Sequence, residues 1–159
     1  MTMSVSLPDA GDEGFMKTKF TCDGENVSPE IVWSGVPSGT RSLVLIVDNP
    51  DAPLMTFVHW VVYNIPPASS GMEENQPRKQ VTHEGYSQGI SGLRKTGYQG
   101  PCPPGSRPHR YFFKLYATSL EPDLETGLGK KDLERLMSGH VIEEAETVVR
   151  YARKHGRRL

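Results

Sequence analysis

Glycine and proline interrupt this chain so often that long regular elements have little room. The 159 residues include 16 glycines and 13 prolines, about 18% of the chain against roughly 12% in average usage. No Gly-X-Y period accompanies them, and 36% of the residues are hydrophobic, which excludes a fibrous or low-complexity chain. We expect one domain over residues 1–159, with flexible tails at 1–14 and 154–159, in which glycine and proline form turns between strands. An all-helical fold is close to excluded.

Four segments have the features of β-strands. Residues 42–47 are an uninterrupted apolar run, which is typical of a strand that is buried on both faces. Residues 59–65 and 110–117 are rich in β-branched and aromatic side chains, and two prolines follow the first of them. Residues 31–33 are a shorter candidate that ends at Ser34-Gly35.

Helical patterns occur only near the end of the chain. Residues 130–140 place Leu133, Leu136 and Met137 on one face, and Gly139 is a suitable stop. Residues 141–154 fit two structures. Their apolar side chains form a helical stripe, yet alternate residues also read as one face of a strand. Periodicity alone weakly favours a helix there.

Charge and hydropathy narrow the choice of partners and location. Eighteen basic and 19 acidic residues give a net charge of −1 without the basic stripe of a nucleic-acid-binding protein. A basic cluster at the end of the chain is expected to be a solvated tail and not a phosphate- or membrane-binding patch; it comprises Arg150, Arg153, Lys154, Arg157 and Arg158. No signal peptide and no apolar run long enough for a membrane span are visible. We therefore expect a cytoplasmic protein.

The two cysteines give no sign of a metal site. Cys22 and Cys102 are 80 residues apart, without C-x-x-C spacing. We expect two reduced thiols, and a bridge between them is the less favoured alternative.

Two stiff loops combine constrained backbone with titratable groups. Residues 48–53 (DNPDAP) follow the first predicted strand, and their prolines could be cis or trans. They could hold a binding site, or Asp48 and Asp51 could simply cap a turn. Residues 97–111 (GYQGPCPPGSRPHRY) could present backbone amides to an anion, or could be only a rigid connection.

His59 and His109 each begin a predicted strand directly after one of these regions. Together with the nearby aspartates they could form a His/His/Asp group for metal binding or hydrolysis. The sequence contains no G-x-S-x-G, H-E-x-x-H or P-loop pattern, so the indications of an enzyme are weak. His83, His140 and His155 lack such context and are expected to be structural or surface residues.

Several spaced motifs, in order, make the chain similar to the phosphatidylethanolamine-binding protein family, in its smaller bacterial and archaeal Raf-kinase-inhibitor-like branch. The resemblance covers residues 20–151. It rests on FTCDGENVSP (20–29), WSGVP (33–37), NPDAP (49–53), HWVVYN (59–64), GYQGPCPP (97–104), HRY (109–111) and GH (139–140).

The resemblance implies a mainly β fold, an antiparallel Greek-key sandwich with one or two short helices. It implies that residues 143–151 form a strand, against the local helical pattern. It also implies a small anion pocket where the two loops meet. We expect no cofactor and no bound metal. Carried over position by position, the pocket residues are Asn49, Asp51, His59, Gly100, Pro101, His109 and Tyr111.

One position departs from the family. The family usually has aspartate where this chain has Asn49, and the adjacent Asp48 should point to the other side of its strand. The loss of one acidic group should favour anions.

The function expected from these residues is non-enzymatic binding of a phosphate-type or carboxylate group by His59, His109, Tyr111 and loop amides, with Asp51 orienting the imidazoles. The resemblance adds a kinase or protease as a protein partner, and a homodimer. The alternatives are a hydrolase that uses the same His/His/Asp group, and an interaction module whose pocket is vestigial.

Overall fold

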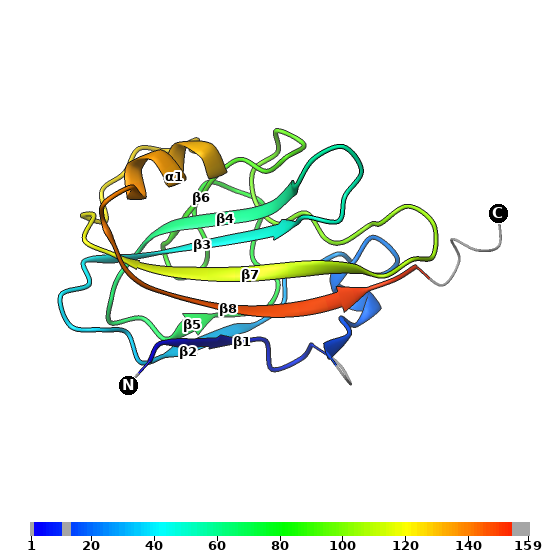
Figure 1. Cartoon of the computed structure of the whole chain (residues 1–159), viewed down its shortest axis with the longest axis horizontal. Helices are drawn as coiled ribbons and strands as arrows, with labels where there is room; N and C mark the ends of the chain where they lie inside the picture. Colours follow the sequence, from blue (N-terminus) through cyan, green and yellow to red (C-terminus); the bar gives the residue numbers. More distant parts are fainter. Residues whose placement is uncertain (1, 11–13, 154–159) are drawn as a thin grey trace.

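The computed structural model describes residues 2–10 and 14–153 and consists mainly of antiparallel strands (Figure 1). A five-stranded sheet has the order β6-β4-β3-β7-β8, and a three-stranded sheet has the order β1-β2-β5. The larger sheet contains β3 (Ser42–Asn49), β4 (Phe57–Ile65), β6 (Ser87–Gln88), β7 (His109–Thr118) and β8 (Val141–Tyr151). The smaller contains β1 (Ser4–Ser6), β2 (Ile31–Ser34) and β5 (Gly71–Met72). The expected mainly β sandwich is confirmed.

The central strand β3 is buried on both faces, as its unbroken apolar sequence predicts. Leu43, Leu45 and Val47 pack toward the smaller sheet, in a core that includes Trp33. Val44 and Ile46 point the other way and pack with side chains of the single α-helix of the described chain, α1 (Lys130–Met137). Figure 1 shows α1 and the smaller sheet on opposite sides of the larger one. Burial of both faces therefore fixes β3 at the centre of the fold.

The ambiguous C-terminal segment is a strand. β8 pairs with β7 from Thr118↔Val141 to His109↔Tyr151, and the opposite charges of Lys114 and Glu146 face each other across the pair. The strand begins two residues before the predicted range of 143–151. Helix α1 ends at Met137, earlier than residue 140, and Gly139 takes a positive φ of 80° in the turn that leads to β8. Long-range pairing with β7 outweighs the local helical stripe.

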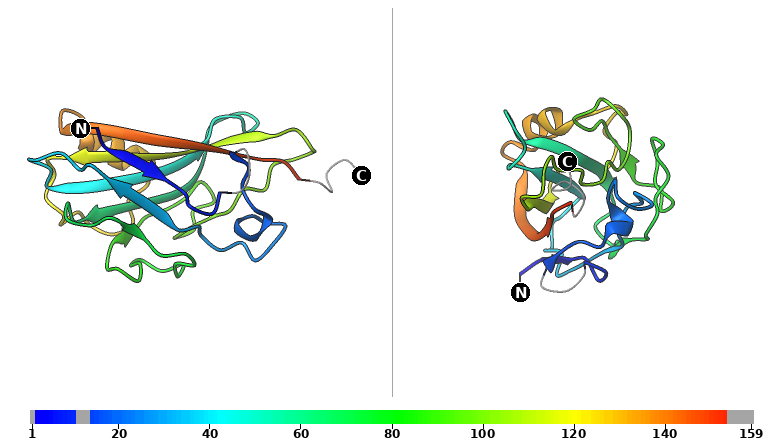
Figure 2. Two further views of the ribbon diagram at one scale, coloured as in Figure 1. Left: turned by 90° about the horizontal axis from the view of Figure 1, so that it is seen from below. Right: turned by 90° about the vertical axis from the view of Figure 1, so that its right-hand side faces the viewer.

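The N-terminal residues lie in the fold and not in a flexible tail, so that expectation was wrong for residues 2–10. Val5 in β1 pairs with Trp33 in β2, and Met3, Val5 and Leu7 are buried in the main core. Figure 2 shows β1 running beside β8. A 3-10 turn, η2 (Thr18–Phe20), follows and buries Phe20. The tail expected at residues 154–159, which carries most of the basic cluster, is outside the described residues.

Two further findings concern the whole described chain. Its peptide bonds are all trans, including those before the prolines of the 48–53 loop. None of the helices found in residues 2–10 and 14–153 has the length and apolar character that crossing a bilayer would require.

Candidate functional site

A cavity of about 370 Å³ lies at the edge of the sheet where β3 ends and where β4 and β7 begin. These three ends coincide because β3 is antiparallel to both neighbours. The two stiff loops identified in the sequence therefore meet at one place. The lining residues come from these strand ends, from the segment after η2, and from the loops after β3 and between β6 and β7: Cys22, Asn26, Asn49, Ala52, Phe57, His59, Leu93, Gln99, Gly100, Cys102, Pro103, Pro104, His109 and Tyr111.

His59 is buried in the cavity wall, with 5% of its surface exposed. Its Nδ1 lies 2.6 Å from the backbone carbonyl oxygen of Gln99, and the Gln99 N–H donates to the His59 carbonyl at 2.9 Å. Its ring also contacts Phe57 and Tyr111 edge to face. Burial lowers the pKa of His59 to about 4, so the imidazole is neutral near pH 7.

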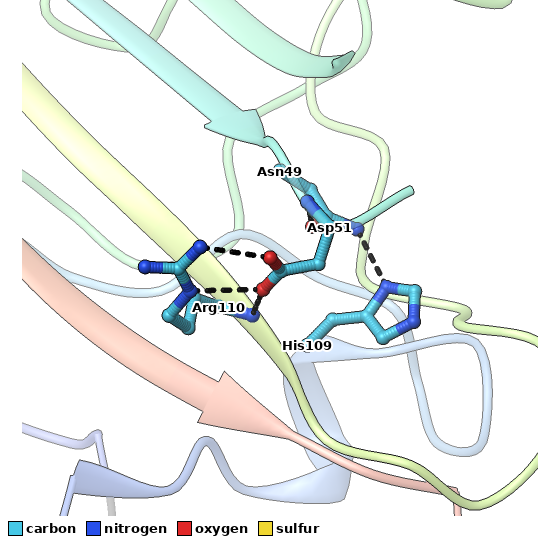
Figure 3. Close-up of polar contacts among 4 residues, drawn as sticks. All are labelled: Asn49, Asp51, His109 and Arg110. Atoms are coloured by element: carbon cyan, nitrogen blue, oxygen red, sulfur yellow. Dashed lines mark hydrogen bonds and ion pairs between the residues drawn. The ribbon is translucent and has the colours of Figure 1, made fainter. Parts of the chain in front are cut away.

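His109 is held by Asn49, as Figure 3 shows. The Asn49 side-chain oxygen accepts the backbone N–H of Asp51 at 2.9 Å, which leaves its amide nitrogen 3.0 Å from Nδ1 of His109. Asn49 and His109 are both buried. Asn49, where this chain differs from the motif it resembles, thus contacts the second histidine directly.

Asp51 does not orient the imidazoles, and that expectation was wrong. Its carboxylate accepts hydrogen bonds from the Arg110 side chain at 2.8 and 3.0 Å and from the Arg110 backbone at 2.8 Å (Figure 3). The hydrogen bonds from the Arg110 side chain hold the pKa of Asp51 at about 2. Asp51 is not among the cavity-lining residues, so it braces the loop from outside. The sequence contained a signal for the Asp51–Arg110 pair. Arg110 directly follows His109 in a strand, and neighbouring strand residues point to opposite sides, so Arg110 points away from the cavity.

Two residues that line the cavity each carry a buried polar atom with no partner among the described residues: the hydroxyl of Tyr111 and the side-chain nitrogen of Gln99. Burial raises the pKa of Tyr111 well above its usual value, so this hydroxyl keeps its proton. A buried polar group without a hydrogen bond costs about 1–3 kcal/mol of stability, so two of them beside one small cavity are unusual in a folded protein. The sequence pointed to Tyr111 through the family motif and missed Gln99.

The 99–104 loop is fixed against the segment after η2. A Cβ at Gly100 would lie 2.0 Å from the Asn26 side-chain oxygen, so the close approach requires glycine, and the Gly100 N–H donates to that oxygen. Pro101 does not line the cavity; its carbonyl accepts the Cys22 N–H at 3.1 Å. The expected site residues thus divide into five that line the cavity, which are Asn49, His59, Gly100, His109 and Tyr111, and two that support it, which are Asp51 and Pro101.

Cys22 and Cys102 form a disulfide, with their Cα atoms 5.4 Å apart, so the expectation of two reduced thiols was wrong. Both cysteines line the cavity, and Cys102 is exposed. Their separation of 80 residues gave no hint of this proximity, because the fold and not the spacing brings the two loops together.

Comparison with known proteins identifies one family. The sequence model of the phosphatidylethanolamine-binding protein family matches residues 6–152. A UPF0098 protein of Methanothermobacter thermautotrophicus is 49% identical over 151 residues, which cover 95% of this chain and 99% of that protein. Another, from Aquifex aeolicus, is 46% identical over 84% of this chain and 79% of its own length.

Two solved structures share the fold over nearly their whole length. CT736 of Chlamydia trachomatis, described as a phosphatidylethanolamine-binding protein homologue, superposes with a TM-score of 0.86 at 32% identity and covers 96% of this chain and 99% of its own. YbcL of E. coli, described as a member of the mammalian PEBP family, gives 0.87 at 29% identity, with coverages of 97% and 100%. With a family match that spans most of its length, the chain belongs to the phosphatidylethanolamine-binding protein family.

Proposed function

We propose that this chain is a non-enzymatic binding protein for a small anion that carries a phosphate-type or carboxylate group. One observation carries the proposal: the Tyr111 hydroxyl and the Gln99 side-chain nitrogen are buried without partners among the described residues, beside two histidines in one cavity. Both are hydrogen-bond donors, and an anionic oxygen is the acceptor that would satisfy them.

The electrostatics of the surroundings support an anion. Asn49 is uncharged where the family usually carries an acid, and the Asp51 carboxylate is already paired with Arg110. No unpaired carboxylate of the described chain therefore lines the cavity, and an incoming anion meets little repulsion. The prolines, the disulfide and the Gly100–Asn26 contact hold the loop in place before binding, which reduces the entropy that binding must otherwise remove.

The test is a calorimetric titration of inorganic phosphate into the wild-type protein and into His109→Ala. We expect measurable binding by the wild type and at least a tenfold loss in the variant, because His109 lines the cavity. His83→Ala is the matched control, since His83 is exposed and is not part of the cavity wall. Equal binding by wild type and His109→Ala, or none by either, would overturn the proposal.

A hydrolase finds less support in the same residues. The carboxylate of Asp51 is engaged by Arg110 and contacts neither histidine, so the expected His/His/Asp group is not assembled. Within residues 2–10 and 14–153, no three His, Cys, Asp or Glu side chains are grouped so as to hold a metal ion. A panel of phosphoesterase and esterase substrates tests this point, and turnover that His59→Ala abolishes would replace binding by catalysis.

We extend the proposal to a modulator of a kinase or protease in the cytoplasm, which receives an acidic or phosphorylated group of its partner in this cavity. Inhibition of a purified kinase and protease panel, with His109→Ala beside the wild type, tests this extension. Inhibition that survives in His109→Ala would instead indicate an interaction module with a vestigial pocket.

A further inference from the structure

The disulfide between Cys22 and Cys102 joins two segments that hydrogen bonds already hold together. The Cys22 N–H donates to the Pro101 carbonyl at 3.1 Å, directly beside the bridge. A few residues away, the Tyr98 hydroxyl donates to the Phe20 carbonyl at 2.6 Å, and both of these groups are buried. Neither hydrogen bond needs the sulfur–sulfur bond, so we expect the two segments to stay adjacent when that bond is cleaved.

The two cysteines differ in how open they are to solvent. Pro101 and Pro103 are buried on either side of Cys102, yet Cys102 itself is an exposed residue. Cys22 is only partly exposed. An external thiolate must reach one sulfur of a disulfide in order to open it, and exposed disulfides are therefore more labile than buried ones. Cys102 is the side of this bridge at which an external thiol can enter.

Cleavage of the bridge should leave the hydrophobic core intact. Neither Cys22 nor Cys102 is among the side chains of the two core clusters. In the chain-entropy model a disulfide stabilises a protein mainly because it restricts the unfolded chain. A folded form with two thiols is the expected product of reduction.

We propose that Cys22 and Cys102 form a thiol–disulfide exchange site for a low-molecular-weight thiol, with Cys102 as the attacked residue and Cys22 as the resolving residue. In the forward step the thiolate of the small molecule attacks Sγ of Cys102 and forms a new S–S bond there. The Cys22–Cys102 bond breaks, and its electron pair stays on the Cys22 sulfur, which takes up a proton. The product is a mixed disulfide on Cys102 and a thiol on Cys22.

Two steps can follow, and the geometry favours the internal one. The Cys22 thiolate can attack Cys102 Sγ, release the small molecule as a thiol and restore the bridge. A second small thiol can instead attack the mixed disulfide, which gives two protein thiols and the disulfide of the small molecule, with two electrons transferred to the protein. The Cα atoms of the pair are 5.4 Å apart, so the internal attack has the advantage of proximity. The chain has no third cysteine that could compete.

The first experiment asks whether the folded protein exchanges. Oxidised wild-type protein is incubated with reduced glutathione, quenched with acid and analysed by intact mass spectrometry, while near-UV circular dichroism follows the tertiary structure. We expect conversion to the dithiol with an unchanged near-UV spectrum, and oxidised glutathione should restore the bridge. A bridge that reacts only in urea, or a near-UV spectrum that collapses on reduction, would show a purely structural disulfide and would overturn the proposal.

The second experiment assigns the two roles with single variants. Cys22→Ser lacks the resolving thiol, so oxidised glutathione should leave a lasting mixed disulfide on Cys102. Cys102→Ser is the matched control, because it keeps one thiol of the same pair at the less exposed position. It should form its mixed disulfide at least tenfold more slowly. Equal rates in the two variants, or a faster reaction of Cys102→Ser, would overturn the proposal.

The same ratio can be measured without a substitution. Reduced wild-type protein is treated with less than one equivalent of iodoacetamide, and peptide mapping then gives the share of label on each cysteine. We expect at least tenfold more label on Cys102 than on Cys22, and an even distribution would contradict the assigned roles. This measurement decides the question even if a variant fails to fold. None of the three readouts involves anion binding, so their outcome is independent of the proposed function.

Discussion

Asp48 and Asn49 are consecutive at the end of β3, yet their side chains enter two very different polar environments. Asp48 is buried, and its carboxylate lies 2.9 Å from the Lys130 ammonium and 3.4 Å from that of Lys114. Asn49 faces the cavity, where Tyr111 and Gln99 keep buried donors without partners among the described residues. On one face of the strand the buried carboxylate is paired with two lysines, and on the other face two buried polar groups have no partner among the described residues. Incomplete pairing, and not burial or charge, separates the candidate site from a structural cluster.

The largest expected change in stability comes from removal of the Cys22–Cys102 disulfide, which lines the cavity. The double variant Cys22→Ser with Cys102→Ser should lower the free energy of unfolding by about 3 kcal/mol, because the disulfide closes a long loop of the unfolded chain. Urea denaturation measures this change, with wild type in a thiol reductant as the parallel sample. Identical unfolding midpoints for oxidised wild type and the double variant would refute it.

The second effect is the pH dependence of stability that His59 imposes. Its pKa is about 4 in the fold, against an ordinary value of 6.5, so between these values the unfolded chain binds a proton that the folded chain does not. The contribution is complete above pH 6.5 and is lost as the pH falls toward 4, by roughly 3 kcal/mol in all. Urea unfolding at pH 7.5, 6, 5 and 4.5 should show this loss, and His59→Gln should flatten it. An equal pH slope in both proteins would show that other groups are responsible.

The third prediction separates the two faces of β3. Asp48→Asn should destabilise the fold by about 2 kcal/mol, because it leaves two half-buried lysines without their carboxylate, and should leave phosphate affinity unchanged. Glu121→Gln is the matched control, since its ion pair with Arg41 is exposed and should contribute less than about 1 kcal/mol. Thermal unfolding and phosphate titration of both variants provide the measurement. A loss of phosphate affinity in Asp48→Asn would mean that the two faces are coupled.

The smallest expected change in stability comes from two tyrosine variants whose effects on stability have opposite signs. Tyr111→Phe removes an unpaired buried hydroxyl, so it should stabilise the fold by up to about 1 kcal/mol while weakening phosphate binding about tenfold. Tyr63→Phe is the mirror image, because the Tyr63 hydroxyl donates to the Glu125 carbonyl at 2.8 Å on the α1 side of the sheet. It should destabilise by about 1 kcal/mol without affecting binding. Destabilisation by both variants would remove the distinction between the two faces.

Much of the fold followed from the sequence, because the local strand preference of β3, β4 and β7 agrees with their positions in the sheet. β8 did not follow from its local pattern, since periodicity alone weakly favours a helix there; the resemblance implied the strand, and pairing with β7 stabilises it. At the site, His59 and His109 were indicated by their positions beside the stiff loops and Tyr111 by the motif resemblance, and the binding role of all three stays a prediction. Gln99 was missed because its unpaired amide is a property of the assembled cavity. The role of Asp51 was misassigned because the Arg110 side chain binds both oxygens of its carboxylate.

Cys102 is an exposed residue of the cavity wall and gives this cavity a point of chemical access. After mild reduction, a thiol-directed reagent would attach its label to the wall of the binding space itself, without an engineered residue. The labelling rate then becomes a direct reporter of occupancy, because a bound ligand and an incoming reagent compete for the same volume. Candidate ligands could be ranked in this way by mass spectrometry on microgram amounts of the unmodified chain.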